Sequence, residues 1–180
     1  MRVSLNIQEK DQFTVTIKRI GINGEGIGFY QRQIVFVDGL LPGEVADVEV
    51  TKTEKKFAYA RVVKIKKKSP QRITPPCPYY QECGGCQLQH MKYEEQLLQK
   101  QFIVEESFQR YFEKQPRKLV IEPTIGMENP WGYRNKSQLP TRHNGDAVVV
   151  GINQKNTNRL VYINECMVEN NAINQHRKVV

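Results

Sequence analysis

The stretch FTVTIKRIGINGEGIGFY, residues 13–30, decides the fold of the first part of the chain. Its first half alternates apolar with polar side chains, the period of two that is typical of a half-buried strand. Glycines follow at positions 21, 24, 26 and 28. Because glycine accepts positive φ and close approach of another backbone, this half favours a tight turn or a bulged strand. The stretch therefore predicts a strand that leads into a glycine-rich turn or bulge.

Further strand signals follow this stretch. An apolar run at residues 34–37 predicts a strand, and Leu41-Pro42-Gly43-Glu44 predicts a turn after it. Valines at 45, 48 and 50 predict another strand, and the last strand is predicted at residues 57–65. Five short strands joined by Gly and Pro turns are typical of a small closed barrel of the oligonucleotide-binding kind. The GxGxG-like run also suggests dinucleotide binding, but no parallel βαβ pattern surrounds it, so we reject that interpretation.

Composition and charge narrow the class of protein. The chain has 180 residues, 27 Lys and Arg against 19 Asp and Glu, and a formal net charge of +8. The longest apolar stretch, residues 147–152, is far shorter than the roughly 20 residues that span a bilayer. The N-terminal residues lack the apolar segment of a signal peptide. We exclude secreted and membrane proteins, and expect a soluble cytoplasmic protein with a polyanionic partner.

A proline-rich connector divides the chain. Prolines at 70, 75, 76 and 78 stiffen the backbone, so we place the boundary between a barrel over residues 1–69 and a second domain over residues 70–180. The second domain is predicted to be α+β, with strands at 133–139, 147–153 and 159–163. Helices are predicted at residues 91–114 and 165–180. The second of these runs into the terminus without a stop signal, so we expect a fragment of a longer protein. The first helix carries an apolar stripe that predicts core packing: Tyr93, Leu97, Leu98, Phe102, Val104, Phe108 and Tyr111.

The four cysteines lie in the second domain. Cys77, Cys83 and Cys86 form the pattern C-x5-C-x2-C, and Cys166 follows much later. Four thiolates complete either a tetrahedral zinc site or a [4Fe–4S] cluster. Disulfides are disfavoured in a reducing cytoplasm. Zinc sites more often show two short cysteine pairs, so the spacing favours the cluster, while zinc and unrelated buried cysteines stay open.

Basic residues gather in two places. Lys64, Lys66 and Lys68 alternate along the end of the last barrel strand, and Arg134 and Lys136 share one face of the strand predicted at 133–139. Such rows can hold phosphates, and arginine can also stack on an unpaired base. Charges that merely solvate a surface give the same pattern, so both interpretations stay open from the residues alone.

Two sets of motifs carry a resemblance to known families. Residues 21–28, Pro42-Gly43-Glu44 and the basic last strand resemble a TRAM domain, a small RNA-binding β-barrel attached to several RNA-modifying enzymes. CGGCQLQH at 83–90, preceded by CPY at 77–79, resembles the signature of the RNA uracil-5-methyltransferase family. WGYRNK at 131–136, GIN at 151–153 and the cysteine after VYI at 161–163 also match that family's central domain. Together these matches keep the family's order and span nearly the whole chain.

This resemblance implies an S-adenosylmethionine-dependent enzyme that methylates C5 of uridines in 23S rRNA, with tRNA as the less favoured substrate. It implies a TRAM barrel, then a central domain with a [4Fe–4S] cluster held by Cys77, Cys83, Cys86 and Cys166, then a Rossmann-like methyltransferase domain. The family's catalytic cysteine, its base and its S-adenosylmethionine site belong to that last domain. We therefore assign no catalytic or cofactor-binding residue to this chain and expect it to bind RNA without methylating it.

The cluster is expected to be structural, because the methylation that the resemblance implies transfers no electrons. Two other classes of protein share some of these features. A non-catalytic RNA-binding adaptor with a four-cysteine zinc or Fe–S site stays open. A radical S-adenosylmethionine methylthiotransferase, which can also carry a TRAM domain, is disfavoured because that class uses a Cx3Cx2C pattern with one open iron.

Overall fold

The computed structural model describes residues 7–112, 120–145 and 147–177. The chain forms two compact units, and each is built from two separate segments. One unit comprises residues 1–74 and 90–124, and we call it the barrel unit. The other comprises residues 75–89 and 125–180, and we call it the cysteine unit.

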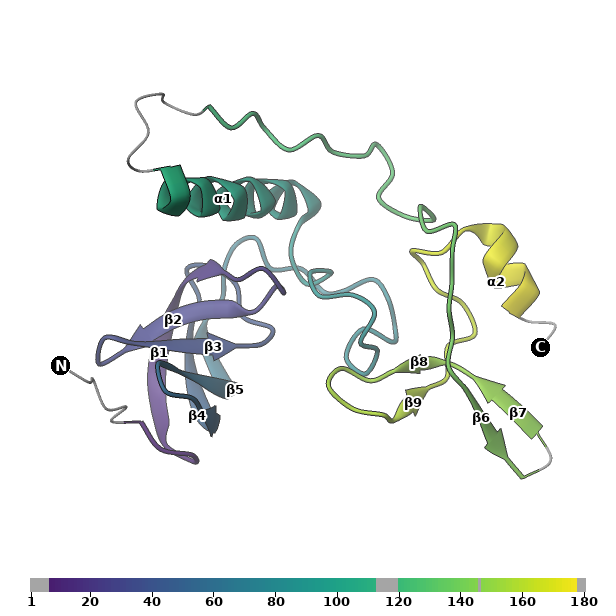
Figure 1. Cartoon of the computed structure of the whole chain (residues 1–180), viewed down its shortest axis with the longest axis horizontal. Helices are drawn as coiled ribbons and strands as arrows, with labels where there is room; N and C mark the ends of the chain where they lie inside the picture. The colour runs from purple at the N-terminus through teal and green to yellow at the C-terminus, as the bar shows by residue number, and fades with distance from the viewer. Residues whose placement is uncertain (1–6, 113–119, 146, 178–180) are drawn as a thin grey trace. The chain divides into compact units, whose positions relative to one another are not determined.

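The barrel unit contains a closed five-stranded barrel (Figure 1). Its strands are β1 (Gln12–Ile20), β2 (Gly26–Tyr30), β3 (Gln33–Val37), β4 (Val45–Thr53) and β5 (Phe57–Lys67). They lie in the order β1-β2-β3-β5-β4, and β4 pairs with β1 to close the barrel. The β3–β5 pairing is parallel, and the other pairings are antiparallel. The predicted barrel is confirmed.

The alternating pattern of the strands fills the barrel interior with small aliphatic side chains. Val15, Ile17, Val35 and Val48 are among the buried residues of this core. The glycines let β1 and β2 approach closely, since a β-carbon on Gly28 would lie 2.9 Å from the Thr16 carbonyl oxygen. The β1–β2 register shifts between Ile17 and Arg19, which confirms the predicted bulge.

The predicted turn at residues 41–44 ends in a buried carboxylate. Pro42 and Gly43, the latter at φ +82°, occupy the central positions that a type II turn requires. The Glu44 N–H donates to the Leu41 carbonyl oxygen at 3.1 Å, and the Leu41 N–H donates to Glu44 Oε2 at 2.9 Å. The turn therefore folds the Glu44 side chain back into the protein, where the residue is fully buried.

Arg72 pairs with this carboxylate. Its Nε and Nη2 donate to Oε1 and Oε2 of Glu44, each at 2.6 Å, and the Ser69 N–H donates to Oε1 at 3.1 Å. Burial alone would raise the pKa of Glu44, but hydrogen bonds from Arg72, Leu41 and Ser69 outweigh it and hold the pKa below its usual value. The ion pair fastens the first residues after the barrel to the turn at 41–44.

Backbone hydrogen bonds also join residues 90–92 to the segment that follows the barrel, so the chain re-enters the barrel unit at residue 90. The Ile73 N–H donates to the His90 carbonyl oxygen and the Lys92 N–H donates to the Gln71 carbonyl oxygen, both at 3.0 Å. Helix α1 (Tyr93–Phe112) follows directly and belongs to the barrel unit. The compact units therefore are not separated by one boundary after residue 69, because the chain passes between them more than once. The assignment of residues 70–180 to one sequence domain stays a prediction.

The apolar stripe of α1 does not form the core that its spacing predicts. Leu98, Phe102 and Tyr111 are 48%, 50% and 83% exposed, and Gln99 is the buried residue of the helix. The prediction of core packing is wrong for these side chains. Arg19 forms an ion pair with Glu106 at 2.9 Å. None of the helices in the described part of the chain has the length and apolar character needed to cross a membrane.

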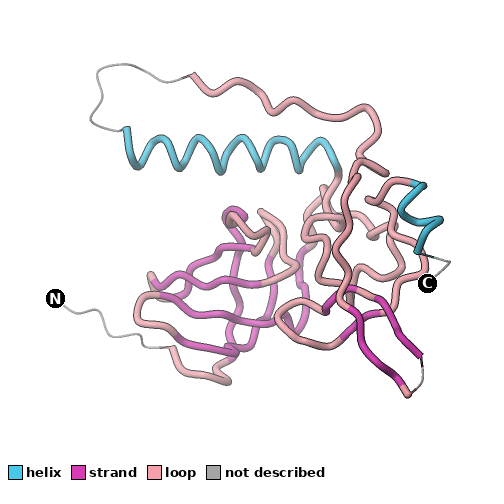
Figure 2. Tube along the Cα trace, turned by 45° about the vertical axis from the view of Figure 1, so that its right-hand side comes forward, coloured by secondary structure: helices cyan, strands magenta, loops and turns pink. Residues whose placement is uncertain are grey.

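The cysteine unit consists largely of loops (Figure 2). Two antiparallel pairs of strands confirm the predicted hairpins, and the helix predicted at 165–180 is seen from residue 171. Its elements are β6 (Thr141–Asn144), β7 (Ala147–Val150), β8 (Ile152–Asn153), β9 (Leu160–Val161) and α2 (Asn171–Arg177). The strand predicted at 133–139 is wrong. Only an isolated bridge between Arg134 and Glu169 forms there, because a single neighbouring segment supplies backbone partners.

Acidification is expected to destabilise the barrel unit through His90. This side chain is buried, and burial, followed by the charge of Arg72, lowers its pKa from 6.5 to about 4 even though Glu44 acts in the opposite direction. Between pH 4 and 6.5 the histidine is therefore protonated in the unfolded chain and neutral in the folded chain. The contribution of neutral His90 to the free energy of unfolding is complete above pH 6.5 and falls as the pH approaches 4, by at most about 3 kcal/mol.

Urea unfolding followed by circular dichroism at about pH 7 and about pH 4.5 checks this prediction. The stability difference between the two pH values should be smaller in His90→Gln than in the unmodified chain. His143→Gln serves as the control, because His143 is exposed. An equal pH dependence in the unmodified chain and in His90→Gln would show that His90 is not the group responsible.

Candidate metal centre

The first three cysteines lie in a loop made of tight turns. The Cys83 N–H donates to the Tyr79 carbonyl oxygen at 2.7 Å, and the Tyr80 N–H donates to the Cys77 carbonyl oxygen at 3.2 Å. The Gly84 N–H then donates to the carbonyl oxygen of Asn153, the last residue of β8, at 3.1 Å. A β-carbon on Gly84 would lie 2.7 Å from that oxygen. Glycine at this position therefore allows the loop to pair closely with β8.

All four cysteines line one small pocket of the cysteine unit. None of the four forms a disulfide; Cys166 is buried and the other three are half-buried. Ile152, Ile163 and Val168 supply apolar walls, and Arg134 also reaches the lining. The structure thus brings together the four residues that the sequence predicts as ligands, although Cys166 lies far from the others along the chain.

The surroundings of Cys83 and Cys86 favour the neutral thiol over the thiolate. Burial raises the pKa of Cys83, and the N–H of Gly85, 3.3 Å from Cys83 Sγ, acts in the opposite direction. Burial also raises the pKa of Cys86, against a hydrogen bond from Gln89 and the charge of Arg134. A bound metal deprotonates its thiol ligands and so reverses this preference.

The donor set fits a [4Fe–4S] cluster in number and type. A cluster takes four thiolates, each on a different iron, whereas a zinc ion needs its sulfurs about 2.3 Å from a single centre. Among the described residues, no group of three or more His, Cys, Asp or Glu side chains is arranged to hold one ion. Four thiols line one shared pocket, with an N–H aimed at one sulfur, so the residues present suit this group in number and in chemical type.

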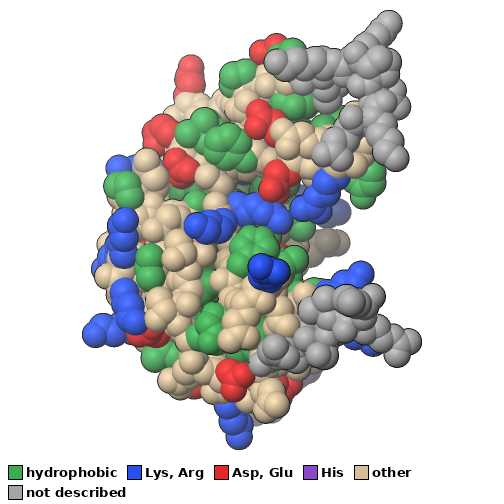
Figure 3. Space-filling view, turned by 90° about the vertical axis from the view of Figure 1, so that its left-hand side faces the viewer, with side chains coloured by type: hydrophobic (Ala, Val, Ile, Leu, Met, Phe, Trp, Pro, Cys, Tyr) green, Lys and Arg blue, Asp and Glu red, His purple; other side chains and the backbone are tan. Residues whose placement is uncertain are grey.

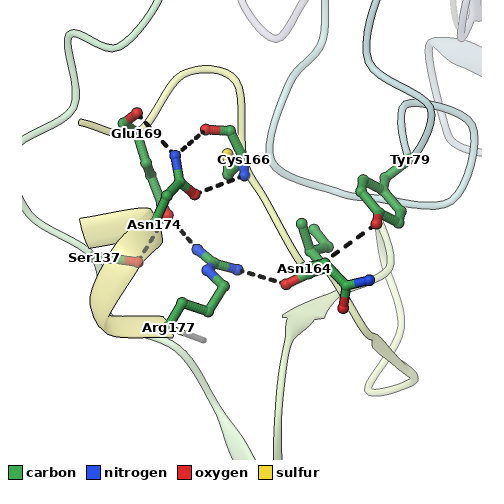
Figure 4. Close-up of polar contacts among 8 residues, drawn as sticks. Tyr79, Ser137, Asn164, Cys166, Glu169, Asn174 and Arg177 are labelled. Carbon is green, nitrogen blue, oxygen red and sulfur yellow. Dashed lines mark hydrogen bonds and ion pairs between the residues drawn. The ribbon is translucent and has the colours of Figure 1, made fainter. Parts of the chain in front are cut away.

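The side chain of Asn174 forms two hydrogen bonds with the backbone of Cys166 (Figure 4). The Cys166 N–H donates to Asn174 Oδ1 at 2.8 Å, and Asn174 Nδ2 donates to the Cys166 carbonyl oxygen at 3.0 Å. The same Nδ2 donates to the carbonyl oxygen of Glu169 at 3.3 Å. The buried Asn174 amide therefore fixes the backbone turn that presents Cys166.

A buried ion pair supports the same turn. The Arg177 guanidinium contacts the Glu169 carboxylate, and Ser137 Oγ donates to Glu169 Oε1 at 2.7 Å. Arg177 also donates to the Ile163 carbonyl oxygen at 3.3 Å (Figure 4). The sequence does not indicate Asn174, Glu169 or Arg177, because their spacing matches no motif and their shared role depends on how the loop before α2 folds.

Replacing Asn174 with alanine is expected to loosen Cys166. The change leaves the buried N–H and C=O of Cys166 without their partners, and each such loss costs about 1–3 kcal/mol. We therefore expect a loss of about 2–4 kcal/mol in the stability of the cysteine unit and faster release of bound metal to a chelator. Release kinetics can be followed by absorbance. Gln175→Ala, an exposed change on α2, is the control, and equal release rates would contradict this role.

The basic residues predicted to contact RNA lie in both units. Lys64 and Lys66 lie on β5 and Lys68 follows it, and all three are exposed. Lys66 forms an ion pair with Asp47 at 2.6 Å and donates to Thr14 Oγ1 at 2.9 Å. Figure 3 shows Lys and Arg side chains spread over the visible face, with acidic and apolar side chains between them.

Arg134 and Lys136 have different environments. Lys136 is exposed, whereas Arg134 is half-buried and lines the cysteine pocket. Its backbone N–H donates to the Val168 carbonyl oxygen at 2.8 Å. The two side chains do not share a strand face as predicted, because this segment is extended without a paired partner along its length.

Comparison with known protein families supports the resemblance found in the sequence. Residues 8–63, which cover the barrel strands almost completely, match the family model described as the TRAM domain. The chain is 51% identical over 168 residues to an uncharacterized RNA methyltransferase of Bacillus anthracis, covering 93% of this chain and 36% of that protein. A similar relative from Halalkalibacterium halodurans is 49% identical over 174 residues, covering 97% of this chain and 38% of the relative. The chain thus spans little more than a third of the length of these curated relatives.

A solved structure has a similar fold. It is the crystal structure of the Pyrococcus abyssi tRNA (uracil-54, C5)-methyltransferase in complex with S-adenosyl-L-homocysteine. It aligns with 90% of this chain and 34% of its own, with a TM-score of 0.52 and 22% identity. This likeness concerns the arrangement of the backbone.

Proposed function

We propose that this chain is the RNA-recognition and iron–sulfur portion of an S-adenosylmethionine-dependent RNA (uracil-5-)-methyltransferase that acts on 23S rRNA. In this proposal the TRAM barrel binds RNA, and the cysteine unit holds a [4Fe–4S] cluster through Cys77, Cys83, Cys86 and Cys166. The convergence of these four cysteines on one pocket carries the proposal. The relatives named RNA methyltransferase support the reaction class.

The four cysteines have one role in this proposal, which is ligation. When bound, a cluster would supply iron–thiolate bonds that join the loop at residues 77–86 to the segment after β9. The protein's own contribution is to hold that segment: Asn174 fixes the Cys166 backbone, and Glu169 with Arg177 fixes the turn beneath it. Methylation of uracil C5 needs a nucleophilic thiolate and a base, and we assign neither to this chain. That chemistry and the S-adenosylmethionine site would belong to a further domain of a longer protein.

The proposed RNA contacts are Lys64, Lys66 and Lys68 in the barrel unit and Arg134 and Lys136 in the cysteine unit. Exposed Lys64 and Lys68 lie beside a barrel whose family model is TRAM, which supports phosphate contact there. Lys66 already pairs with Asp47, so its contribution should be smaller. The position of Arg134 at the rim of the cysteine pocket supports a contact that depends on an intact cysteine loop.

Two assays test the proposal. The first measures binding of the 180-residue chain to 23S rRNA transcripts and to tRNA in direct competition; tighter binding to the rRNA is the expected result. The second supplies the polypeptide encoded by the whole reading frame with S-adenosylmethionine and the same RNAs, and detects 5-methyluridine by mass spectrometry. Methylation of tRNA but not rRNA would overturn the choice of substrate. RNA binding without any methylation would favour the non-catalytic adaptor.

A further inference from the structure

A second concave surface lies in the cysteine unit, separate from the pocket that the four thiols line. It is an open groove of about 650 Å³, within the size range of small-ligand sites. Tyr79 and Glu82 of the cysteine loop form one side, Arg142 and His143 come from β6, and Arg159 and Tyr162 flank β9. None of these residues belongs to the RNA contacts proposed above.

The charge of this groove favours an anionic ligand. Arg142 and Arg159 are exposed, and Glu82 is the single acidic residue of the lining. Among the salt bridges of the described residues, none involves either arginine. Arg142 Nη2 donates to the Asn158 carbonyl oxygen at 3.3 Å, which orients the guanidinium and leaves further N–H groups for a ligand.

Two tyrosines give the groove aromatic surface. Tyr162 is 55% exposed although Val161 and Ile163 on either side of it are buried, so the local alternation of the chain turns its ring outward. Tyr79 packs against the apolar cluster of the cysteine unit and accepts a hydrogen bond from the Asn164 N–H at 3.5 Å (Figure 4). The Tyr79 ring is therefore held by packing and a hydrogen bond, and the Tyr162 ring is exposed to solvent.

Arginine beside an exposed aromatic ring is the combination with which proteins bind unpaired nucleotides. The bases stack on the ring, and the guanidinium groups hold the phosphates. A base-paired helix keeps its bases stacked on one another and unavailable to such a ring. The chemistry of the groove therefore distinguishes single-stranded from double-stranded RNA.

We propose that this groove binds one or two unpaired nucleotides of RNA, with Arg142 and Arg159 on the phosphates and Tyr162 against a base. The inference rests on the proposed function, because that function supplies RNA as the polyanion. It adds a site that the basic residues of the barrel and the segment at 134–136 do not form. Because Tyr79 and Glu82 lie between two of the proposed ligands, Cys77 and Cys83, the same loop lines the cysteine pocket and one wall of the groove.

The test uses fluorescence anisotropy with a labelled oligouridylate of about nine nucleotides and with an RNA duplex of equal length. Arg142→Gln with Arg159→Gln should weaken oligouridylate binding about tenfold or more and reduce the slope of log K against log salt by about 1.4. Tyr162→Ala should weaken it about tenfold with an unchanged slope. Binding of the duplex should change much less in each case.

Matched controls separate this inference from the proposed function. Lys92→Gln with Lys100→Gln removes the same charge from exposed positions of the barrel unit and should leave the affinity near that of the unmodified chain. If the unmodified chain binds no RNA, the proposed function fails together with the groove. If it binds RNA and the arginine variant behaves like the lysine control, only the groove inference is overturned. Dependence of polyglutamate binding on the arginines, with RNA binding unchanged, would assign the groove to an acidic protein segment.

Discussion

Replacing Cys86 with alanine is expected to remove iron and sulfide from the chain and to destabilise the cysteine unit, while the barrel unit stays folded. The buried apolar side chains of the cysteine unit are few, with Val161, Ile163 and Val168 at their centre. Small domains with so little core commonly depend on a metal for stability. The barrel has its own closed sheet and a larger core. It does not need the cluster to stay folded.

Hydrogen exchange resolved along the chain distinguishes these outcomes in the intact protein. Backbone amides of β1 and β4 should keep their protection in Cys86→Ala, and those of β8 and β9 should lose it. Gln81→Ala, an exposed change in the same loop, should keep both its iron and its protection pattern. Unchanged iron content in Cys86→Ala would contradict the assignment of Cys86 as a ligand.

Replacing Glu44 with alanine is expected to lower the free energy of unfolding of the barrel unit by about 3–5 kcal/mol. The carboxylate is fully buried and accepts hydrogen bonds from Arg72, Leu41 and Ser69. Its removal leaves the largely buried Arg72 guanidinium without a counter-charge and two backbone N–H groups without acceptors. Few single changes in the barrel remove as many buried partners.

The slowest-exchanging amides of β1 and β4 measure this loss. Glu49→Ala is the matched control in the same barrel, because Glu49 pairs with Arg61 at an exposed site where ion pairs contribute little. Equal losses in the two variants would show that burial of Glu44 does not matter. The pKa of Glu44 lies below its usual value of 4.5, so its contribution is present above that pH and is lost as the pH falls through the folded pKa.

The barrel could be predicted from the sequence because short stretches of neighbouring residues specify its strands and turns. Alternation over residues 13–18, the glycines at 26 and 28 and the Pro42-Gly43 turn each specify backbone geometry without reference to distant residues. The structure confirms the closed sheet and the bulge at those positions. The close approach of Gly84 to β8 is different, because it depends on Asn153, which lies far along the chain, and the sequence does not indicate it.

The errors concern features that depend on distant parts of the chain. The stripe on α1 has helical spacing, but spacing does not say which surface covers it, and Leu98, Phe102 and Tyr111 are exposed in the structure. The strand predicted at 133–139 has strand-like residues, but a strand forms only where a neighbouring segment pairs along it, and here only Glu169 forms a bridge with Arg134. Asn174 forms hydrogen bonds with the Cys166 backbone, and no local sequence motif predicts the loop conformation that brings the two together.

The iron, sulfide and zinc content of the chain purified without oxygen, measured beside its visible spectrum, tests whether the four cysteines hold a [4Fe–4S] cluster. The four converging cysteines lead us to expect about four irons and four sulfides per chain, with a broad absorption band near roughly 400 nm. One zinc per chain without sulfide would contradict the cluster and would favour a zinc-stabilised RNA-binding adaptor.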